Sequence, residues 1–236
     1  MTSRWIDIKA HDGSSFKGYL SLPQQAGKVA KGPGIVLIQE IFGVNSHIRG
    51  VADQYASDGY TVLAPDLFWR MQPMLELGYG QDDFQKGIDY MQKFDFAAGV
   101  KDLAATVATL RGLPECTGKV ASIGFCMGGM LSYLCAANAG VDAAVCYYGG
   151  GIHNKLEEAG KIKCPVLFHF AGNDSYIPAS AIDAVKQTFA GREGVRIDVY
   201  PGVEHGFNCW DRGAYNQQSA ALARGRSLSF LATTIS

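Results

Sequence analysis

Residues 124–129, Gly-Phe-Cys-Met-Gly-Gly, constrain the fold more than any other part of the chain. An apolar run of strand length, residues 119–123, precedes them, and residues 130–138 after them have the pattern of a helix. A nucleophilic residue at a strand-to-helix turn, with glycine two positions before and after it, is typical of a nucleophile elbow. Larger side chains at the glycine positions would collide with the neighbouring strand or helix. The segment therefore predicts that Cys126 lies at the tip of a tight turn and attacks an acyl carbon.

The turn would also place the Cys126 sulfur at the N-terminus of the following helix. Unpaired N–H groups and the positive end of the helix dipole favour a thiolate there, so the pKa of the thiol is expected to lie below about 8.5. A packed structural cysteine beside a glycine-rich helix start is the alternative for this short motif, because cysteines are often buried and inert. The segments further along the chain distinguish the two explanations.

Short apolar runs alternate with helical patterns along most of the chain. Two β patterns open it, at residues 3–9 and 16–22, with the turn sequence His-Asp-Gly at residues 11–13 between them. Buried strands are then expected at residues 34–38, 60–64, 120–125, 143–148, 165–170 and 196–200. Helices are expected at residues 47–57, 84–94, 100–113, 130–138 and 214–231, and an aromatic loop at residues 65–80.

This alternation predicts an α/β fold formed by a single domain over residues 1–236. Its mostly parallel, doubly wound sheet would have helices on both faces and an N-terminal β-hairpin. Ligands of such sheets bind at the carboxyl ends of the strands. If Cys126 is catalytic, its partners should therefore directly follow other strands.

Two candidate partners do so. Asp174 follows the predicted strand 165–170, and His205 follows the strand that ends at Tyr200. Taken singly, each residue also has a purely structural explanation. Asp174 could be a turn residue, and His205 could be a loop residue stacked on Phe207. Together they predict that His205 is the general base for the Cys126 thiol, and that Asp174 fixes its tautomer and stabilises its charged form.

An oxyanion would need two aimed N–H donors. The backbone N–H of Met127, the residue after the nucleophile, is one candidate, and the N–H of Ile41, in the turn after strand 34–38, is the other. Losing one such donor typically costs about 2.7–4 kcal/mol of transition-state stabilisation.

Composition excludes several function classes. The net charge is −1, from 21 basic and 22 acidic residues, and no basic block predicts nucleic-acid binding. No apolar stretch has the length of a membrane span, and residues 1–10 have no signal-peptide pattern, so a cytoplasmic protein without membrane partners is expected. The six cysteines form no C-x-x-C pair, which predicts neither a metal site nor disulfides. The size and low net charge of the chain are compatible with a monomer, and they do not exclude a dimer.

Several motifs together resemble the dienelactone hydrolase family of α/β-hydrolases. The resemblance extends over nearly the whole chain, and the combination of Gln-Glu-Ile-Phe-Gly with the elbow is its most specific part. The motifs are residues 39–45 (Gln-Glu-Ile-Phe-Gly-Val-Asn), 59–60, 64–67, 124–129, 147–149, 172–174 and 205–207 (His-Gly-Phe). The resemblance implies an α/β-hydrolase fold, no cofactor, and a small lactone or ester as substrate.

The resemblance also assigns a role to Glu40, which matches a family glutamate that contacts the nucleophilic thiol. In that picture the thiol is neutral at rest, and substrate displaces the carboxylate, which helps to deprotonate it. His169, which lies within a strand, is expected to be a satisfied core histidine and not a second base.

Two family arginines that bind the dienelactone carboxylate have no counterpart in this chain. The helix that should supply one has none at about residues 82–91, and Cys209 stands at the position of the other, four residues after His205. Arg212 or Arg70 could substitute from a different direction, although solvation at the surface is the expected fate of each. An anion clamp is therefore expected to be absent, and dienelactone itself to be a poor substrate. A more apolar pocket is expected, lined by Phe42, Phe84, Ile88, Tyr147, Phe207, Cys209 and Trp210.

These observations predict a hydrolase that cleaves a small lactone or carboxylic ester through a Cys126–His205–Asp174 triad and a thioester acyl-enzyme. A general carboxylesterase, or another hydrolase on the same scaffold, is the alternative within enzymes. A non-catalytic small-molecule receptor is a third possibility, although such proteins usually lose a triad member. A nucleotide-binding oxidoreductase would need G-x-G-x-x-G after an early strand, which residues 39–43 lack.

Overall fold

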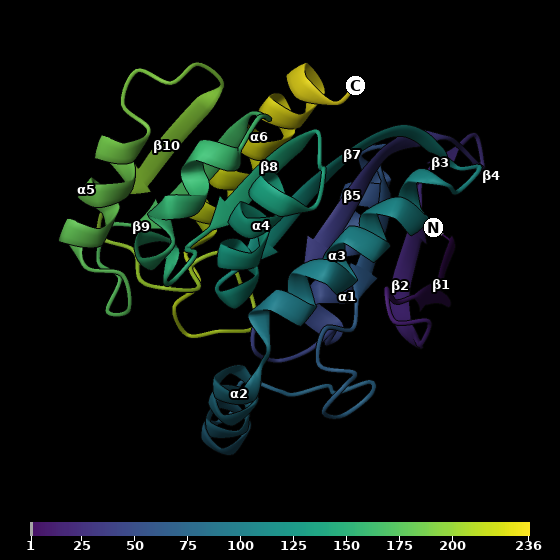
Figure 1. The fold of residues 1–236 in the computed structure, drawn as a ribbon, viewed down its shortest axis with the longest axis horizontal. Coiled ribbons are helices and arrows are strands. Elements are labelled where there is room, and N and C mark those ends of the chain that lie inside the picture. Colours follow the sequence, from purple (N-terminus) through teal and green to yellow (C-terminus); the bar gives the residue numbers. More distant parts are fainter. Residues whose placement is uncertain (1) are drawn as a thin grey trace.

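An eight-stranded sheet runs through the centre of the protein (Figure 1), whose computed structural model describes residues 2–236. Its spatial order is β1-β2-β6-β5-β7-β8-β9-β10. The first three strands pair antiparallel, and the others pair parallel. The strands are β1 (Thr2–Lys9), β2 (Ser15–Leu22), β5 (Gly32–Ile38), β6 (Thr61–Pro65), β7 (Cys116–Phe125), β8 (Ala143–Tyr147), β9 (Val166–Ala171) and β10 (Val195–Tyr200).

Helices cover both faces of this sheet. Figure 1 shows α3 and α4 in front of the sheet and α6, in yellow, behind it. The helices are α1 (Ser46–Ser57), α2 (Gln81–Lys93), α3 (Phe96–Arg111), α4 (Met127–Asn138), α5 (Ala179–Thr188) and α6 (Gln217–Thr234). Strands β5, β6, β8 and β9 are almost wholly buried and mainly apolar, and β7 is buried from Val120 onward, as expected for parallel strands covered on both faces. None of the helices in residues 2–236 is long and apolar enough to cross a membrane.

The predicted hairpin, strands and helices are confirmed, with ends that differ by a few residues. The sequence missed helix α5, the small ribbon of β3 (Gln24–Gln25) and β4 (Lys28–Val29), and the 3₁₀ turns η1 (Ile152–Asn154) and η2 (Leu156–Lys161). The predicted loop after β6 forms no helix or strand. It is tied to the loop after β5 by a bridge between Gly43 and Glu76 and by the Leu77 N–H, which donates to the Phe42 carbonyl.

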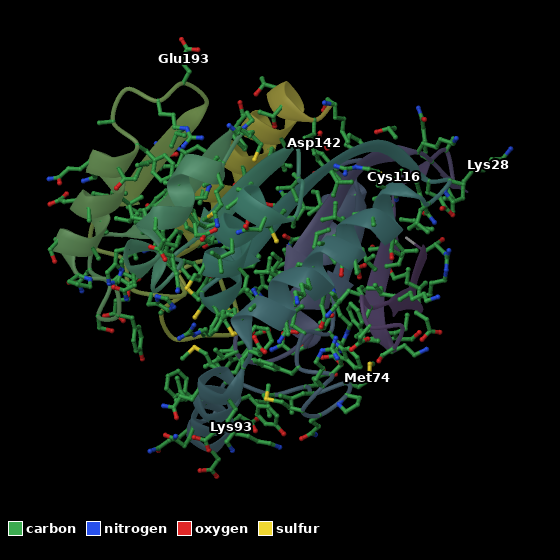
Figure 2. The ribbon with its side chains drawn as sticks, in the orientation of Figure 1. Lys28, Met74, Lys93, Cys116, Asp142 and Glu193 are labelled. Carbon is green, nitrogen blue, oxygen red and sulfur yellow. The ribbon has the colours of Figure 1, made fainter. Side chains whose placement is uncertain are left out.

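The strand order reverses direction at β5, because β6 lies on one side of it and the chain then returns to form β7 on the other. The loops that leave β5 and β7 therefore diverge at one edge, which is where ligands of such sheets bind. Figure 2 labels Glu193 and Asp142, which precede β10 and β8, at the end of the molecule opposite Lys93 of α2. Helix α2 thus lies beyond the carboxyl edge of the sheet.

Candidate active site

Cys126 lies at a strained turn between β7 and α4. Its backbone has φ 56° and ψ −117°, and it is the N-cap of α4. A Cβ on Gly124 would lie 1.8 Å from the Gly128 carbonyl oxygen, and a Cβ on Gly128 would lie 2.4 Å from the carbonyl oxygens of Ile38 and Gln39. Only glycine therefore permits the backbone to turn this tightly, and the turn presents the half-buried Cys126 side chain at the carboxyl edge.

The ring of His205 is fixed by Asp174. Nδ1 of His205 lies 2.8 Å from Oδ2 of Asp174, and both side chains are buried. The other oxygen, Oδ1, accepts the backbone N–H groups of Tyr176 at 2.8 Å and Ile177 at 3.1 Å. These contacts orient the carboxylate, which in turn leaves Nε2 of His205 as the nitrogen available to other groups.

His205 also interacts with Cys126. Burial alone would lower the pKa of the imidazole, but the Cys126 sulfur and the Asp174 carboxylate together raise it to about 10. The ring of Tyr148, which follows β8, packs edge-on against His205 with centroids 5.0 Å apart. A histidine between a thiol and a carboxylate can accept a proton from the first and be stabilised as a cation by the second.

Cys126 and His205 open into the same cavity, which has a volume of about 380 Å³. Its walls are mainly apolar, and a few polar groups lie near the thiol. The other lining residues are Ile41, Phe42, Phe84, Ile88, Met91, Phe96, Met127, Met130, Gly150, Gly151, His153, Asn154, Tyr176 and Arg212. A cavity of this size and character suits a small, largely apolar molecule with one or two polar groups.

The two residues whose N–H groups the sequence suggests for an oxyanion are both lining residues of this cavity. Ile41 and Met127 both line it, beside Cys126. Within residues 2–236, neither N–H donates a hydrogen bond to another backbone group. Both are therefore available to an oxygen atom bound next to the sulfur.

Glu40 is buried beneath the site and paired with Arg212. Nη1 of Arg212 donates to Oε1 of Glu40 at 3.2 Å, and the Tyr79 hydroxyl lies 3.5 Å from Oε2. Burial raises the pKa of the Glu40 carboxyl above its ordinary value, although Arg212 and His205 both act to lower it. His47 and Cys209 lie beside Glu40 as potential metal ligands, and neither lines the cavity.

Arg212 corrects the expectation that its side chain is solvated at the surface, and it is the one of the two candidate arginines that lines the cavity. Its side chain is 16% exposed, it lines the cavity, and its guanidinium lies 5.8 Å from the centroid of the Phe42 ring. Arg70, by contrast, pairs with Asp12 and Asp102 away from the cavity. In the sequence, Arg70 and Arg212 are equally plausible as the cation of the cavity. Only the fold of the loop after His205 shows that Arg212 takes this position.

Four predicted pocket residues lie outside the cavity lining, in contrast to Phe42, Phe84 and Ile88. Tyr147 faces α6, where its hydroxyl lies 2.8 Å from Oγ of Ser227. Phe207 is fully buried against Tyr148 and Tyr200. The other two, Cys209 and Trp210, lie beside His47.

His169 has the structural role that the sequence predicts. Its Nδ1 lies 2.8 Å from the Tyr200 hydroxyl and its Nε2 lies 2.9 Å from Oγ of Ser227. Burial lowers the pKa of its ring to about 3. The sequence missed Met130, His153 and Tyr176 as lining residues, because α4, η1 and the loop after β9 approach the cavity only in three dimensions.

Known proteins resemble this chain over almost its whole length. The model of the dienelactone hydrolase family matches residues 16–235. The carboxymethylenebutenolidase of Pseudomonas putida is 36% identical over 234 residues, which cover 98% of this chain and 97% of that protein. Carboxymethylenebutenolidase 1 of Cupriavidus pinatubonensis is 30% identical over 233 residues, with 98% and 97% covered.

The fold also closely matches a solved structure. The crystal structure of a Klebsiella pneumoniae protein assigned as a dienelactone hydrolase superimposes with a TM-score of 0.86 at 27% identity. The match covers 98% of each chain.

Proposed function

Because the chain belongs to the dienelactone hydrolase family and is a hydrolase of lactones or esters with the α/β-hydrolase fold, we propose that Cys126 is its nucleophile. The reaction proceeds through a thioester acyl-enzyme, with His205 and Asp174 completing a triad. One observation carries the proposal: Cys126 and His205 open into one cavity, and Asp174 holds the far nitrogen of His205 at 2.8 Å.

In the first half-reaction His205 holds the proton of the Cys126 thiol, and the sulfur attacks the carbonyl carbon as a thiolate. The carbonyl oxygen becomes an oxyanion, which the N–H groups of Ile41 and Met127 stabilise. The C–O bond to the alcohol then breaks, and His205 returns its proton to the leaving alkoxide. For a lactone, the released alcohol stays attached to the acyl group, because the ring has opened.

In the second half-reaction His205 removes a proton from water, which attacks the thioester carbon. The same N–H groups stabilise the second oxyanion. Its collapse breaks the C–S bond, and the proton on His205 returns to the sulfur of Cys126. The enzyme is regenerated, and no electrons pass to a cofactor.

Glu40 assists the first step. Its carboxyl is buried and paired with Arg212, and burial raises its pKa, so its ionised form is a stronger base than an exposed carboxylate. Substrate that engages Arg212 would weaken the contact between Arg212 and Glu40 and free the carboxylate to help deprotonate the Cys126 thiol.

The apolar walls and the single guanidinium support a small lactone or ester as substrate. Phe42, Phe84 and Ile88 offer apolar contacts, and Arg212 lies where a polar or anionic substituent can reach it. The chain acts on a small molecule and needs no nucleic acid or membrane in this proposal. We place the reaction in the cytoplasm and in one domain.

The test is hydrolysis of p-nitrophenyl acetate with covalent trapping. The wild-type enzyme should lose activity after treatment with iodoacetamide, and intact-mass spectrometry of a quenched reaction should find one acetyl group on Cys126. Cys126→Ala should show neither activity nor acetylation. The matched control is Cys164→Ala, because Cys164 is a half-buried free thiol outside the cavity. Unchanged hydrolysis in Cys126→Ala would remove Cys126 from the mechanism.

A further inference from the structure

A second group of reactive side chains lies beneath the cavity and has no part in the proposed reaction except through Glu40. Glu40, His47 and Cys209 each place one ligand atom within 4.8 Å of the other two. All three are buried, and they come from the loop after β5, the start of α1 and the loop after His205. The absence of C-x-x-C pairs could not reveal this group, because its members are brought together only by folding.

His47 indicates that this group receives a ligand. Its ring is completely buried, yet within residues 2–236 neither Nδ1 nor Nε2 has a hydrogen-bond partner. A buried polar group without a partner is costly and requires an explanation.

A second orphaned polar atom lies close by. The Tyr148 hydroxyl is completely buried and also lacks a partner within residues 2–236. It interacts electrostatically with both Glu40 and Cys209. Two side chains near Glu40 and Cys209 therefore have unpartnered polar atoms.

We propose that Glu40, His47 and Cys209 bind a thiophilic divalent cation of the Zn²⁺ class beneath the nucleophile. A carboxylate oxygen, an imidazole nitrogen and a thiolate sulfur are three ligands that Zn²⁺ takes in proteins, with a fourth position left for water or the Tyr148 hydroxyl. Oε1 of Glu40 is bound by Arg212, so Oε2, with only a 3.5 Å contact to Tyr79, is the oxygen that coordinates.

Arg212 determines which cations fit. Its positive charge beside Glu40 opposes any cation, so one carboxylate is not enough to attract a hard ion. A thiolate supplies the second negative charge. As the metal binds, the Cys209 S–H bond breaks, an S–metal bond forms, and the proton leaves to the buffer. Zn²⁺, Cd²⁺ and Co²⁺ form such bonds, whereas Mg²⁺ and Ca²⁺ prefer oxygen ligands.

A groove lies on the far side of Tyr79 from the ligand atoms. The groove, of about 400 Å³, is lined by Tyr79, Phe42 and Arg212. Tyr79 interacts with both Glu40 and Cys209, so it separates the groove from the ligand atoms. Trp210 reports on occupancy, because its ring centroid lies 4.1 Å from that of His47.

Co²⁺ is the probe for the test, since thiolate ligation gives it a sulfur-to-metal charge-transfer band in the near ultraviolet. Titrations use the folded Cys126→Ala protein, in which the nucleophile cannot bind metal. One equivalent of Co²⁺ should produce the band and change the fluorescence of Trp210. Adding Cys209→Ser should abolish the band, and the matched change Cys164→Ser should leave it intact.

A second variant protects the test against a misfolded Cys209→Ser protein. His47→Gln keeps the thiol and removes one ligand, so the apparent Kd for Co²⁺ should rise at least ~10-fold. The absence of a band in the Cys126→Ala protein, a band that persists in Cys209→Ser, or an unchanged Kd in His47→Gln overturns the inference. Because the protein tested is hydrolytically inactive by design, these outcomes are independent of whether the wild-type enzyme cleaves esters.

Discussion

Arg212 donates to Glu40 across 3.2 Å, and this contact links the wall of the cavity to the carboxylate beneath the nucleophile. Glu40 is 1% exposed, whereas Arg212 retains access to the cavity. A substrate anion can therefore compete with Glu40 for the same guanidinium. In the proposed mechanism, this arrangement couples recognition of charge to the state of the thiol.

Arg212→Met should reduce kcat/KM for an anionic lactone by about 10- to 100-fold, because hydrogen bonds to charged groups contribute roughly 1.5–3 kcal/mol. A neutral ester analogue should lose much less. In the wild-type enzyme the neutral ester should still be preferred, since one guanidinium already paired with Glu40 is a weaker clamp than two free ones. Steady-state kinetics on both substrates decide this, and a strong wild-type preference for the anion would contradict it.

Asp174→Asn should lower kcat by about 10³- to 10⁴-fold while KM changes little, because the neutral amide no longer stabilises the His205 cation. The backbone contacts of Tyr176 and Ile177 to the retained oxygen keep the loop in place. Asp183→Asn is the control, since Asp183 lies exposed on α5 beside Lys186. Equal kcat values for the two variants would exclude Asp174 from the triad.

Cys126→Ser should keep the fold but hydrolyse p-nitrophenyl acetate at least about 100-fold more slowly. A hydroxyl is far less easily ionised than a thiol, and the dipole of α4 with His205 is arranged around a thiolate. Circular dichroism and thermal unfolding check that the fold is retained. A serine variant as fast as the wild type would contradict the proposed role of the sulfur.

Gly124→Ala should destabilise the protein by at least about 2 kcal/mol, because the new Cβ would meet the Gly128 carbonyl oxygen at 1.8 Å. Gly160→Ala is the matched control, as nothing lies within 4 Å of the Cβ that it adds. Urea unfolding of the two variants gives the comparison. Equal midpoints would show that the elbow relaxes without cost.

The buried His169 should make the fold less stable in mild acid. Its pKa is about 3 in the folded protein and about 6.5 when unfolded, so between these values only the unfolded chain binds the proton. The contribution of His169 to the free energy of unfolding is therefore complete above pH 6.5. Below that pH it falls by about 1.4 kcal/mol per pH unit. In His169→Gln, the free energy of unfolding should fall less steeply between pH 6.5 and 5, by about 1.4 kcal/mol per pH unit. Parallel slopes from urea unfolding would refute this.

The strands and the three residues of the proposed triad could be placed from the sequence, since continuous apolar runs mark buried parallel strands and their carboxyl ends share one edge. Helix α5 was missed because it begins directly after Pro178 within a polar loop. The β3–β4 ribbon consists of two-residue strands, which are too short to give a periodic pattern.

The cavity wall was predicted less well, because the direction of a side chain depends on strand parity. Tyr147 faces α6, and its neighbour Tyr148 faces His205, so a shift of one residue exchanges the two faces of the sheet. Arg212 was also misplaced, since nothing local distinguishes a loop arginine that folds back onto Glu40 from one that stays in water.

Helix α2 supplies Phe84, Ile88 and Met91 to the cavity but buries only Gly87 among its 13 residues, and Figure 1 shows it standing clear of the sheet. The groups proposed for bond breaking follow strands of the central sheet. Part of the apolar surface that would contact the acyl and alcohol portions of the substrate lies instead on α2. Substitutions at Phe84, Ile88 or Met91 should therefore change substrate selectivity more than they change the groups that break bonds.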